Sequence, residues 1–423
     1  MLVRLPYGAD RTVSFEVPGD CFDGMLSPAP ATPAADPAAA VAEAIDHPIG
    51  SPALDGIVRA GTKVAVICDD ISRPTPVSLI LPILLTRLHT AGVRREDVTV
   101  IMALGSHRYM TPEEISARVG PDIAARYRVV NSEFRDPQKL VHAGRTADGV
   151  DIIVTRDAME ADVRIGIGNI VPHPVMGWSG GGKILFPGVT AEHTVAQFHM
   201  LGGLSDERLV GLENNPVRLR MESWVPTIGL HFIVNTVLDA ESRIVRVVAG
   251  DYVKAHRAGV ETAKAVMCCP MKRRADVLVV SAFPCDEDFW QSGKGFCNAE
   301  GGLKGPDSTM ILVSPNYEGM GPHAEYGACF GSDDSGALLR RLYEGEPVPG
   351  DPLALAVGTA MAKMRHRCRL VVVSDGVTRQ EIEGCGIGYY PLDGLQQAVD
   401  DTLARYDAPA VAAVSNGGEF LLV

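Results

Sequence analysis

The sequence has no apolar run long enough to cross a membrane. Its longest run, VSLILPILL at residues 77–85, is far shorter than the roughly 20 residues of a spanning helix, and it contains Pro82. Residues 1–17, MLVRLPYGADRTVSFEV, alternate apolar and polar side chains around a Gly-Ala-Asp turn. That alternation predicts a β-hairpin and not a signal peptide. We therefore expect no membrane partner.

The sequence is also poor in positive charge and in paired cysteines. Its 39 Lys and Arg against 52 Asp and Glu give a net charge of −13, which disfavours nucleic acid and anionic membranes as partners. The nine cysteines include the adjacent Cys268 and Cys269 but no C-x-x-C pair. A cysteine-based zinc or redox site is therefore not expected, and scattered cysteines indicate a reducing, cytoplasmic location.

Short β-branched runs alternate with helical segments along the chain. These runs are KVAVIC (63–68), VTVIMA (98–103), VRIGIG (163–168), ADVLVV (275–280), TMILVS (309–314) and RLVVVS (369–374). Continuous apolar strands separated by helices indicate parallel sheets that are buried on both faces. The sequence therefore predicts the α/β fold class.

The length of 423 residues allows two or three domains. A boundary is expected near residues 266–274, VMCCPMKRRA, which separate a long helical segment (251–266) from a new strand. We predict an N-terminal domain over 1–268, rejoined by a strand within 408–423, and a C-terminal domain over 269–407.

Polar side chains follow four of the predicted strands, and ligands of open α/β sheets gather at the carboxyl ends of strands. These side chains, in chain order, are Asp69, Asp70, Arg73, His107, Arg108, His173, Lys183, Gln291 and Lys294. Taken singly, each has a structural explanation: Asp70 suits a turn and Arg73 a solvated surface. His107 precedes a helix that Thr111 and Glu114 would start with a capping box. Their convergence is what predicts a site.

Residues 177–183, GWSGGGK, have the spacing of a phosphate-binding loop. That loop needs Ser or Thr after the Lys, where this chain has Ile184, and a helix that begins at the Lys. Pro187 and Gly188 prevent a sustained helix, and the next one is expected near Thr190. We therefore interpret Lys183 as an amine on a chain segment with few side chains, which suits covalent attachment of a flat group.

Two histidines follow on that next helix, His193 and His199. Six residues correspond to about 600° of helical rotation, so the two side chains lie on different sides of the helix. They cannot both bind one metal ion, and we expect one of them at the site.

The motifs DDISRP, GSHR, PHPVMGWSGGGKILFPG, AQFH and FWQSGKG occur in this order over nearly the whole chain. In order and spacing the sequence resembles the lactate racemase family that carries a nickel-pincer nucleotide. The resemblance implies two α/β domains with mainly parallel sheets, with the active site in the cleft between them and the cofactor on the larger N-terminal domain. It also implies transient partners, the proteins that make the cofactor.

The resemblance assigns a role to each candidate residue. Lys183 is similar to the residue joined by a thioamide to the pyridinium-derived mononucleotide, whose second arm is a thiocarboxylate, and His199 is similar to the protein ligand of Ni(II). His107 and His173 are similar to the paired acid–base groups, and Asp70 to the carboxylate that supports them. Cofactor contacts are implied for Ser179, Gly180, Gly181 and Gly182. Substrate contacts are implied for Arg73, Trp290, Gln291 and Lys294.

The chemistry of 2-hydroxy acids explains why these types of residue would be needed together. Their α-proton is too weakly acidic for direct removal, whereas oxidation to a planar keto acid and return of hydride to the other face inverts the centre. Two histidine bases, one for each enantiomer's hydroxyl, suit that route near neutral pH. Trp290 stands where a Tyr is expected in lactate-specific members, so lactate is one candidate among 2-hydroxy acids and sugar acids.

Two other functions are open at this stage. A nicotinamide or pyridoxal-phosphate enzyme would use Lys183 for phosphate or a Schiff base, although GIGNIV (166–171) has Val171 where a dinucleotide motif needs its third Gly. A non-catalytic carrier of the nickel cofactor would also bind it at Lys183. The carrier has no need of both His107 and His173.

Overall fold

The structure is a computed structural model that describes residues 1–105 and 107–423; Ser106 of the GSHR motif lies outside the described residues. Its first sheet has six strands in the order β13-β12-β9-β4-β5-β6, parallel except for the β12–β13 pair. The bounds are β4 (Val64–Asp69), β5 (Val98–Ala103), β6 (Arg128–Asn131), β9 (Val163–Asn169), β12 (Phe232–Leu238) and β13 (Ile244–Gly250). The strands predicted at 63–68, 98–103 and 163–168 are confirmed.

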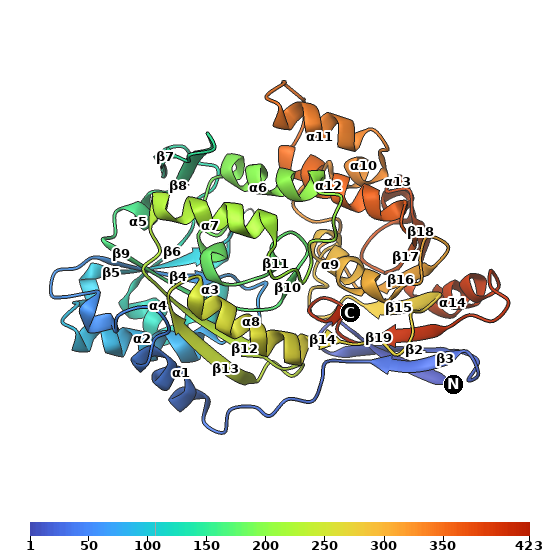
Figure 1. Cartoon of the computed structure of the whole chain (residues 1–423), viewed down its shortest axis with the longest axis horizontal. Coiled ribbons are helices and arrows are strands. Elements are labelled where there is room, and N and C mark those ends of the chain that lie inside the picture. Colours follow the sequence, from blue (N-terminus) through green and yellow to red (C-terminus); the bar gives the residue numbers. More distant parts are fainter. Residues whose placement is uncertain (106) are drawn as a thin grey trace.

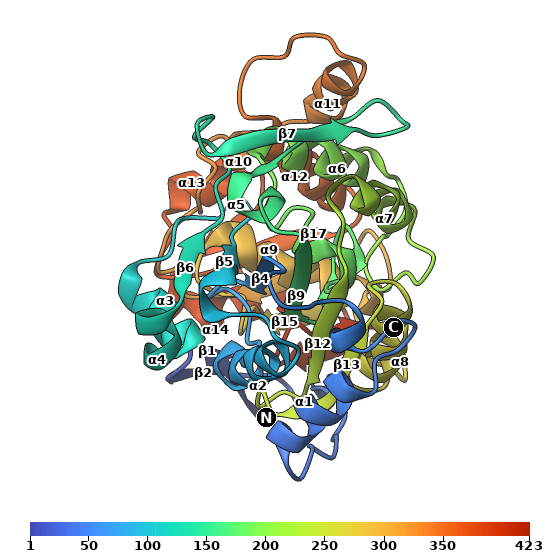
Figure 2. The ribbon, with the colours of Figure 1, turned by 90° about the vertical axis from the view of Figure 1, so that its left-hand side faces the viewer.

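Helices cover both faces of this sheet, as strands without polar alternation require. Apolar side chains of α1 and α2 pack on one face, and side chains of α7 and α8 pack on the other. Figure 2 shows these helices around the sheet. The helices of this part are α1 (Pro37–Asp46), α2 (Val77–Thr90), α3 (Pro112–Val119), α4 (Pro121–Arg126), α5 (Arg156–Met159), α6 (Glu192–Leu204), α7 (Pro216–Ile228) and α8 (Lys254–Met267). Helix α3 begins with the predicted capping box of Thr111 and Glu114.

The second sheet also has six strands, in the order β18-β17-β16-β15-β19-β3, and every pair is parallel. The bounds are β3 (Phe22–Leu26), β15 (Val277–Ser281), β16 (Thr309–Val313), β17 (Arg369–Val373), β18 (Gly388–Tyr390) and β19 (Val411–Val414). Its helices are α9 (Phe289–Ala299), α10 (Tyr326–Gly331), α11 (Ser335–Tyr343), α12 (Pro352–Arg365), α13 (Arg379–Gly384) and α14 (Leu395–Leu403). The remaining predicted strands are confirmed here, and with them the α/β class.

Both ends of the chain lie in this second part (Figure 1). Strand β19 lies in the second sheet, where it pairs with β15 on one side and with β3, from residues 22–26, on the other. All four residues of β19 are buried, which suits a strand inside the sheet, and β3 lies beyond it as the edge strand. The domain boundaries at 268 and 408 stay a prediction.

Four small two-stranded sheets complete the fold, and one of them, β10–β11, lies at the centre of the molecule (Figure 1). They are β1 (Leu2–Tyr7) with β2 (Arg11–Glu16), β7 (Leu140–Arg145) with β8 (Asp151–Thr155), β10 (Pro172–His173) with β11 (Gly177–Trp178), and β14 (Cys268–Cys269) with β20 (Leu421–Leu422). The first confirms the N-terminal hairpin predicted from alternation, and its apolar face packs on the second sheet.

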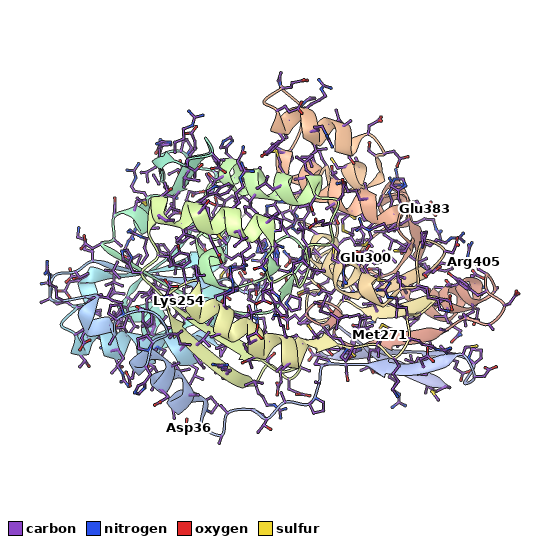
Figure 3. The ribbon with its side chains drawn as sticks, in the orientation of Figure 1. Asp36, Lys254, Met271, Glu300, Glu383 and Arg405 are labelled. Atoms are coloured by element: carbon purple, nitrogen blue, oxygen red, sulfur yellow. The ribbon has the colours of Figure 1, made fainter. Side chains whose placement is uncertain are left out.

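Charged side chains such as Asp36, Glu383 and Arg405 are exposed at the rim (Figure 3). No helix in the described part of the chain combines the length and the apolar character that a bilayer crossing requires.

Candidate active site

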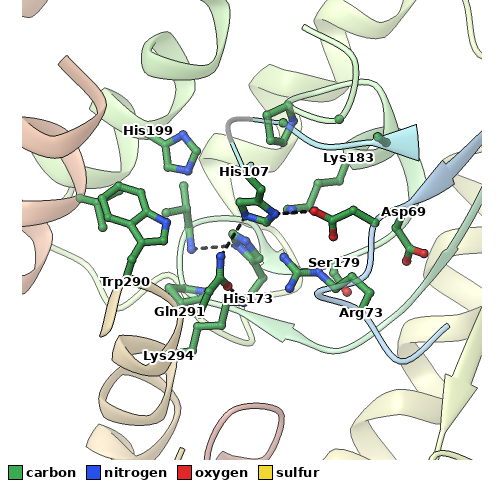
Figure 4. Close-up of a pocket in the computed structure, with 18 of the residues that line it drawn as sticks. Asp69, Arg73, His107, His173, Ser179, Lys183, His199, Trp290, Gln291 and Lys294 are labelled. Atoms are coloured by element: carbon green, nitrogen blue, oxygen red, sulfur yellow. Dashed lines mark hydrogen bonds and ion pairs between the residues drawn. The ribbon is translucent and has the colours of Figure 1, made fainter. Parts of the chain in front are cut away.

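One cavity of about 1270 Å³, open to solvent, collects most of the predicted site residues (Figure 4). Its walls come from the segments after β4, β5 and β9 of the first sheet, and from helices α9 and α12 of the second part. Helix α6 packs against α12 and brings one of its histidines to the same space. The carboxyl ends of the first sheet therefore meet the second part of the chain at this cavity.

The buried Asp70 and the half-buried His107 form a pair in this cavity. They follow β4 and β5, which are neighbouring parallel strands, so both arrive at one edge of the sheet. Oδ2 of Asp70 lies 2.6 Å from Nδ1 of His107. Burial alone would raise the pKa of Asp70, but the facing His107 lowers it below its ordinary value. The ionised carboxylate only accepts hydrogen bonds, so Nδ1 carries the proton and Nε2 of His107 holds a lone pair.

Helix α9 brings Gln291 and Lys294 to the other side of His107. The two side chains are three residues apart and lie on one face of the helix. The side-chain nitrogen of Gln291 donates to Nε2 of His107 at 2.9 Å, and its oxygen accepts from Nζ of Lys294. A continuous hydrogen-bonded chain thus runs from Asp70 to Lys294 and joins the two parts of the molecule.

Cationic groups gather around that chain. Arg73 and Lys294 both line the cavity, and burial, followed by the charge of Arg73, lowers the pKa of Lys294. The carboxylates that act on these cations include Asp70 at Arg73, and Glu287 and Glu419 at Lys294. A bound carboxylate would offset the repulsion between the two cations, so the cavity is suited to an anionic ligand.

The glycine-rich segment does not form a phosphate loop. Hairpin β10–β11 is followed by a single 3₁₀ turn, Gly181–Ile184, and no α-helix starts at Lys183. Helix α6 begins at Glu192 instead. Gly180 has a φ of 78°, a left-handed conformation that a side chain would strain. The rejection of the phosphate loop from Ile184 and Pro187 is therefore confirmed.

Lys183 lines the cavity with its amine. Burial, followed by the charges of Arg73 and Lys294, lowers the pKa of Lys183 well below its ordinary value. A lowered pKa favours the neutral amine, which is the nucleophilic form that covalent attachment requires.

His199 occupies the cavity from helix α6. Its Nδ1 donates to the carbonyl of Val195, one turn earlier, at 2.9 Å, which leaves the lone pair on Nε2. Burial lowers the pKa of His199 to about 3, so the ring is neutral. A neutral imidazole whose other nitrogen is bonded to a carbonyl is the usual state of a histidine metal ligand. His193 of the same helix is exposed and lies in a separate surface hollow, as expected from the rotation between them.

His173 contributes a further imidazole to the cavity wall. Its ring is held by the turn that it starts, because Nδ1 accepts from the backbone N–H groups of Val175 and Met176. Burial, followed by the charges of Lys183 and Lys294, lowers the pKa of His173 well below its ordinary value. The ring is therefore neutral.

Trp290 forms the apolar wall beside Gln291. Its ring lies 4.5 Å from the ring of His323 and packs edge-on against Tyr326. Small and apolar side chains of α12 continue this wall, among them Val357 and Met361. This wall is suited to the non-polar part of a ligand.

The cavity holds nearly all of the predicted site residues. Those that line it are Asp70, Arg73, His107, His173, Ser179, Gly180, Lys183, His199, Trp290, Gln291 and Lys294. Gly181 and Gly182 face away from it. A Cβ on Gly181 would lie 2.9 Å from the carbonyl oxygen of Tyr252, and one on Gly182 would lie 2.9 Å from Val225, so these glycines allow close packing on α8 and α7.

Two residues that hold the glycine-rich segment in place, Arg218 and His256, belong to none of the sequence motifs. Arg218 donates to the carbonyl oxygens of Met176 and Trp178 and so anchors the glycine-rich segment from helix α7. His256 of α8 donates from Nε2 to the carbonyl oxygen of Ser179 at 2.8 Å. An Arg and a His that are fully buried in amphipathic helices give no periodic signal of their own.

Asn235 also belongs to none of the predicted motifs, although the pattern of its strand marks it. It stands within the run FIVNTVL of β12, where its amide side chain, followed by Thr236, breaks the apolar pattern of a fully buried strand. Its side-chain oxygen accepts from the backbone N–H of Gly181 at 2.8 Å. A polar residue inside an otherwise apolar strand therefore marked the wall of the site.

The described residues contain no group of three or more His, Cys, Asp or Glu that could hold a metal ion. His199 would thus be a single protein ligand. A metal at His199 needs its other ligands from a non-protein group, and an attached group on Lys183 is able to supply them. The donors present fit a cofactor that carries its own metal ligands.

Comparison with known proteins was made on the sequence and on the fold. The lactate racemase N-terminal domain matches residues 7–210. A lactate racemase of Lactiplantibacillus plantarum is 30% identical over 343 residues, which cover 80% of each chain. A lactate racemase of Thermoanaerobacterium thermosaccharolyticum is 28% identical over 318 residues, 74% of each chain.

Solved structures share the fold. The lactate racemase apoprotein of Thermoanaerobacterium thermosaccharolyticum matches with a TM-score of 0.84 and 23% identity over 100% of both chains. A Thermotoga maritima protein matches with a TM-score of 0.72 and 19% identity over 91% of this chain and 98% of that chain. With the sequence relatives, these matches lead to one conclusion: the chain belongs to the lactate racemase family and is an isomerase.

Proposed function

We propose that the protein is a racemase or epimerase of a small 2-hydroxy acid, with lactate as the first candidate. The observation that carries this proposal is the hydrogen-bonded chain from Asp70 through His107 and Gln291 to Lys294, set beside Lys183 and His199 in one cavity. The family membership and the names of the relatives support it. The proposed site lies between the predicted domains.

The cations of the cavity would bind the substrate carboxylate. Arg73 offers a planar guanidinium and Lys294 an ammonium from the opposite wall, so a carboxylate held by both is fixed in orientation. Trp290 would contact the remaining part of the substrate. Gln291 would hydrogen-bond the substrate oxygen when that oxygen takes its place beside His107.

His107 and His173 would act on the substrate hydroxyl. Nε2 of His107 has a lone pair for the hydroxyl proton, and the charge of Asp70 stabilises the imidazolium that results. The apolar wall of Trp290 and α12 would lie beside the reacting carbon.

The proposed cofactor is the nickel-pincer nucleotide. Lys183 would hold it covalently, His199 would bind its Ni(II), and Ser179 and Gly180 would line its binding site. When bound, this group supplies an acceptor for the hydride of the α-carbon. The lowered pKa of Lys183 supports this choice, and so does the Nδ1 hydrogen bond of His199, which leaves a lone pair on its Nε2.

We also propose that the protein works in the cytoplasm and receives its cofactor from the proteins that make it. All nine cysteines are free thiols, which supports a reducing compartment.

The test is mass spectrometry of the intact protein and its peptides, after co-production with the cofactor-making enzymes, with nickel quantitation and a panel of chiral 2-hydroxy acids that includes lactate. We expect a mass increase on the Lys183 peptide, bound nickel, and loss of optical purity of at least one acid. Active protein with unmodified Lys183 and no nickel would overturn the cofactor proposal. Loaded protein that interconverts no 2-hydroxy acid would indicate a carrier.

A further inference from the structure

The motif DDISRP begins with an aspartate that the proposed function does not use. Asp69 is the last residue of β4, and the residues after it form a tight turn that carries Asp70 and Arg73 to the cavity. Across this turn, the backbone N–H of Arg73 donates to the carbonyl oxygen of Asp70 at 3.3 Å. Because Arg73 would bind the substrate carboxylate, the contacts that hold the two ends of the turn decide where its guanidinium lies.

Arg118 of helix α3 holds both ends of this turn. Its Nε donates to the carbonyl oxygen of Asp69 at 3.2 Å, where the turn begins. Its Nη1 donates to the carbonyl oxygen of Arg73 at 2.7 Å, where the turn ends. A guanidinium is suited to such a bridge because its N–H groups point in fixed directions. One side chain thus sets the distance between residues 69 and 73 of the main chain.

The carboxylate of Asp69 holds Arg118 in this position. Its Oδ1 accepts from Nη2 of Arg118 at 2.5 Å, and its Oδ2 accepts from the hydroxyl of Thr75 at 2.6 Å. The side chains of Asp69 and Arg118 are only 15% and 11% exposed. A buried ion pair with several charge-assisted hydrogen bonds has a defined geometry, unlike a pair on the surface. We call Asp69 and Arg118 the turn clamp.

The turn clamp also determines which cation neutralises Asp69. Burial raises the pKa of Asp69, and the charge of Arg118 is the largest effect in the opposite direction. Arg73 is the other cation that acts on this carboxylate, with a smaller effect. Without Arg118, the buried Asp69 would attract Arg73 and so compete with a substrate carboxylate for it.

We propose that Asp69 and Arg118 are positioning residues of the substrate site, and that the turn clamp keeps Arg73 in the cavity and free to bind the substrate carboxylate. This inference rests on the proposed function. It gives a role to the first aspartate of DDISRP and to a residue of α3 that belongs to none of the sequence motifs. Both side chains act through Arg73 and have no contact with the substrate in this proposal.

The turn clamp supports Arg73 more than it supports Asp70. The carboxylate of Asp70 has supports of its own, because it accepts from the hydroxyl of Ser72 and from Nδ1 of His107. Among the described residues, the guanidinium of Arg73 has a single hydrogen bond, to the carbonyl oxygen of Ser72 at 3.1 Å. Loss of the clamp should therefore weaken substrate binding and leave proton transfer at His107 nearly unchanged.

The first experiment compares Arg118→Met with wild type in the loaded enzyme, with activity expressed per nickel-bearing chain. Met keeps the apolar stem and removes the three hydrogen bonds of the guanidinium. For the 2-hydroxy acid that the wild type converts best, we expect KM to rise about 10-fold or more and kcat to change by less than about 3-fold. Arg126→Met in helix α4, where the arginine is exposed, is the matched control and should change neither value. A fall in kcat at unchanged KM would overturn the proposal.

The second experiment is a double-mutant cycle that tests whether the turn clamp acts through Arg73. If it does, Arg118→Met should raise KM by less than about 2-fold in the Arg73→Met background. An equal increase in both backgrounds would mean that the two residues act independently, and the proposal would be wrong. If Arg118→Met gives no folded protein, Arg118→Lys takes its place, because an ammonium keeps the charge but not the fork that bridges both ends of the turn.

The third experiment examines the turn in the cofactor-free chain, apart from any activity. Hydrogen exchange followed by mass spectrometry should be at least about 10-fold faster in Arg118→Met than in wild type for peptides that cover residues 70–75. Peptides of β5 should exchange at the same rate in both proteins. Unchanged exchange at residues 70–75 would refute the turn clamp alone. A wild type inactive on every 2-hydroxy acid would instead refute the proposed function.

Discussion

Oδ2 of Asp70 lies 2.6 Å from Nδ1 of His107, in a position where the carboxylate is only 3 % exposed. The side-chain hydroxyl of Ser72 donates to the other carboxylate oxygen at 2.5 Å. The carboxylate is thus fixed from both sides and sets the tautomer of the ring. This arrangement makes Asp70 a positioning residue that acts through His107.

Replacing Asp70 by Asn should lower kcat by about 10²-fold or more, because the amide keeps the shape but not the charge that stabilises the His107 imidazolium. KM should change less, since Asp70 is not proposed to contact the substrate. Steady-state racemisation assays measure both. Nickel content and the mass of the Lys183 peptide serve as controls for intact loading. A wild-type kcat in this variant would show that Asp70 does not assist proton transfer.

Lys183 should react with cyanate at pH 7 faster than the exposed Lys254 in the cofactor-free protein. The reason is that burial and the charges of Arg73 and Lys294 lower the pKa of Lys183, which raises the fraction of neutral, nucleophilic amine. Peptide mass spectrometry over time gives the two carbamylation rates from one sample; Lys254 is the reference (Figure 3). A slower reaction at Lys183 would show that its amine is charged or closed off.

His199→Ala should abolish nickel binding in protein co-produced with the cofactor-making enzymes. His193→Ala on the same helix should leave it unchanged, because His193 is exposed and lies outside the cavity. Nickel per chain is measured by elemental analysis. Thermal unfolding of both variants checks that the helix is intact. Stoichiometric nickel in His199→Ala would mean that another group holds the metal.

Glu133 is a buried carboxylate outside the proposed chemistry, and it gives a pH-dependent stability. Burial alone would raise its pKa, but hydrogen bonds from Tyr109 and from backbone N–H groups lower it to about 2. The stabilisation is complete above the ordinary pKa of a glutamate, about 4.3, and is lost as the pH falls toward 2.

Glu133→Gln should therefore lower the free energy of unfolding by about 1–3 kcal/mol at pH 7. The difference from wild type should shrink below pH 4. Urea denaturation at a series of pH values measures it, with the exposed Glu43→Gln as the matched control. A difference that grows on acidification would have the wrong sign for a carboxylate with a lowered pKa.

The strands and most of the site could be predicted from the sequence because both leave local patterns. Apolar runs such as residues 98–103 mark buried parallel strands, and polar residues directly after them, such as Asp70 and His107, mark the ligand edge. The absence of a helix start at Lys183 could be predicted for the same reason, because Ile184 and Pro187 are local features that do not fit a phosphate-binding loop.

Contacts between distant residues could not be predicted. Nothing within residues 411–414 shows that this all-apolar strand pairs with β15 and β3. The anchor of the glycine-rich segment by Arg218 is likewise a long-range contact.

The pairing of β3 with β19 has a consequence for the order in which the nascent chain acquires structure. Residues 22–26 leave the ribosome near the start of synthesis, and their partner, residues 411–414, leaves it near the end. The first sheet has all its strands once residue 250 has emerged, whereas β3 must wait unpaired for nearly the whole of translation. All strands of the sheet that positions Lys183 are therefore synthesised long before β19, which the second sheet, the one next to Gln291 and Lys294, needs for completion.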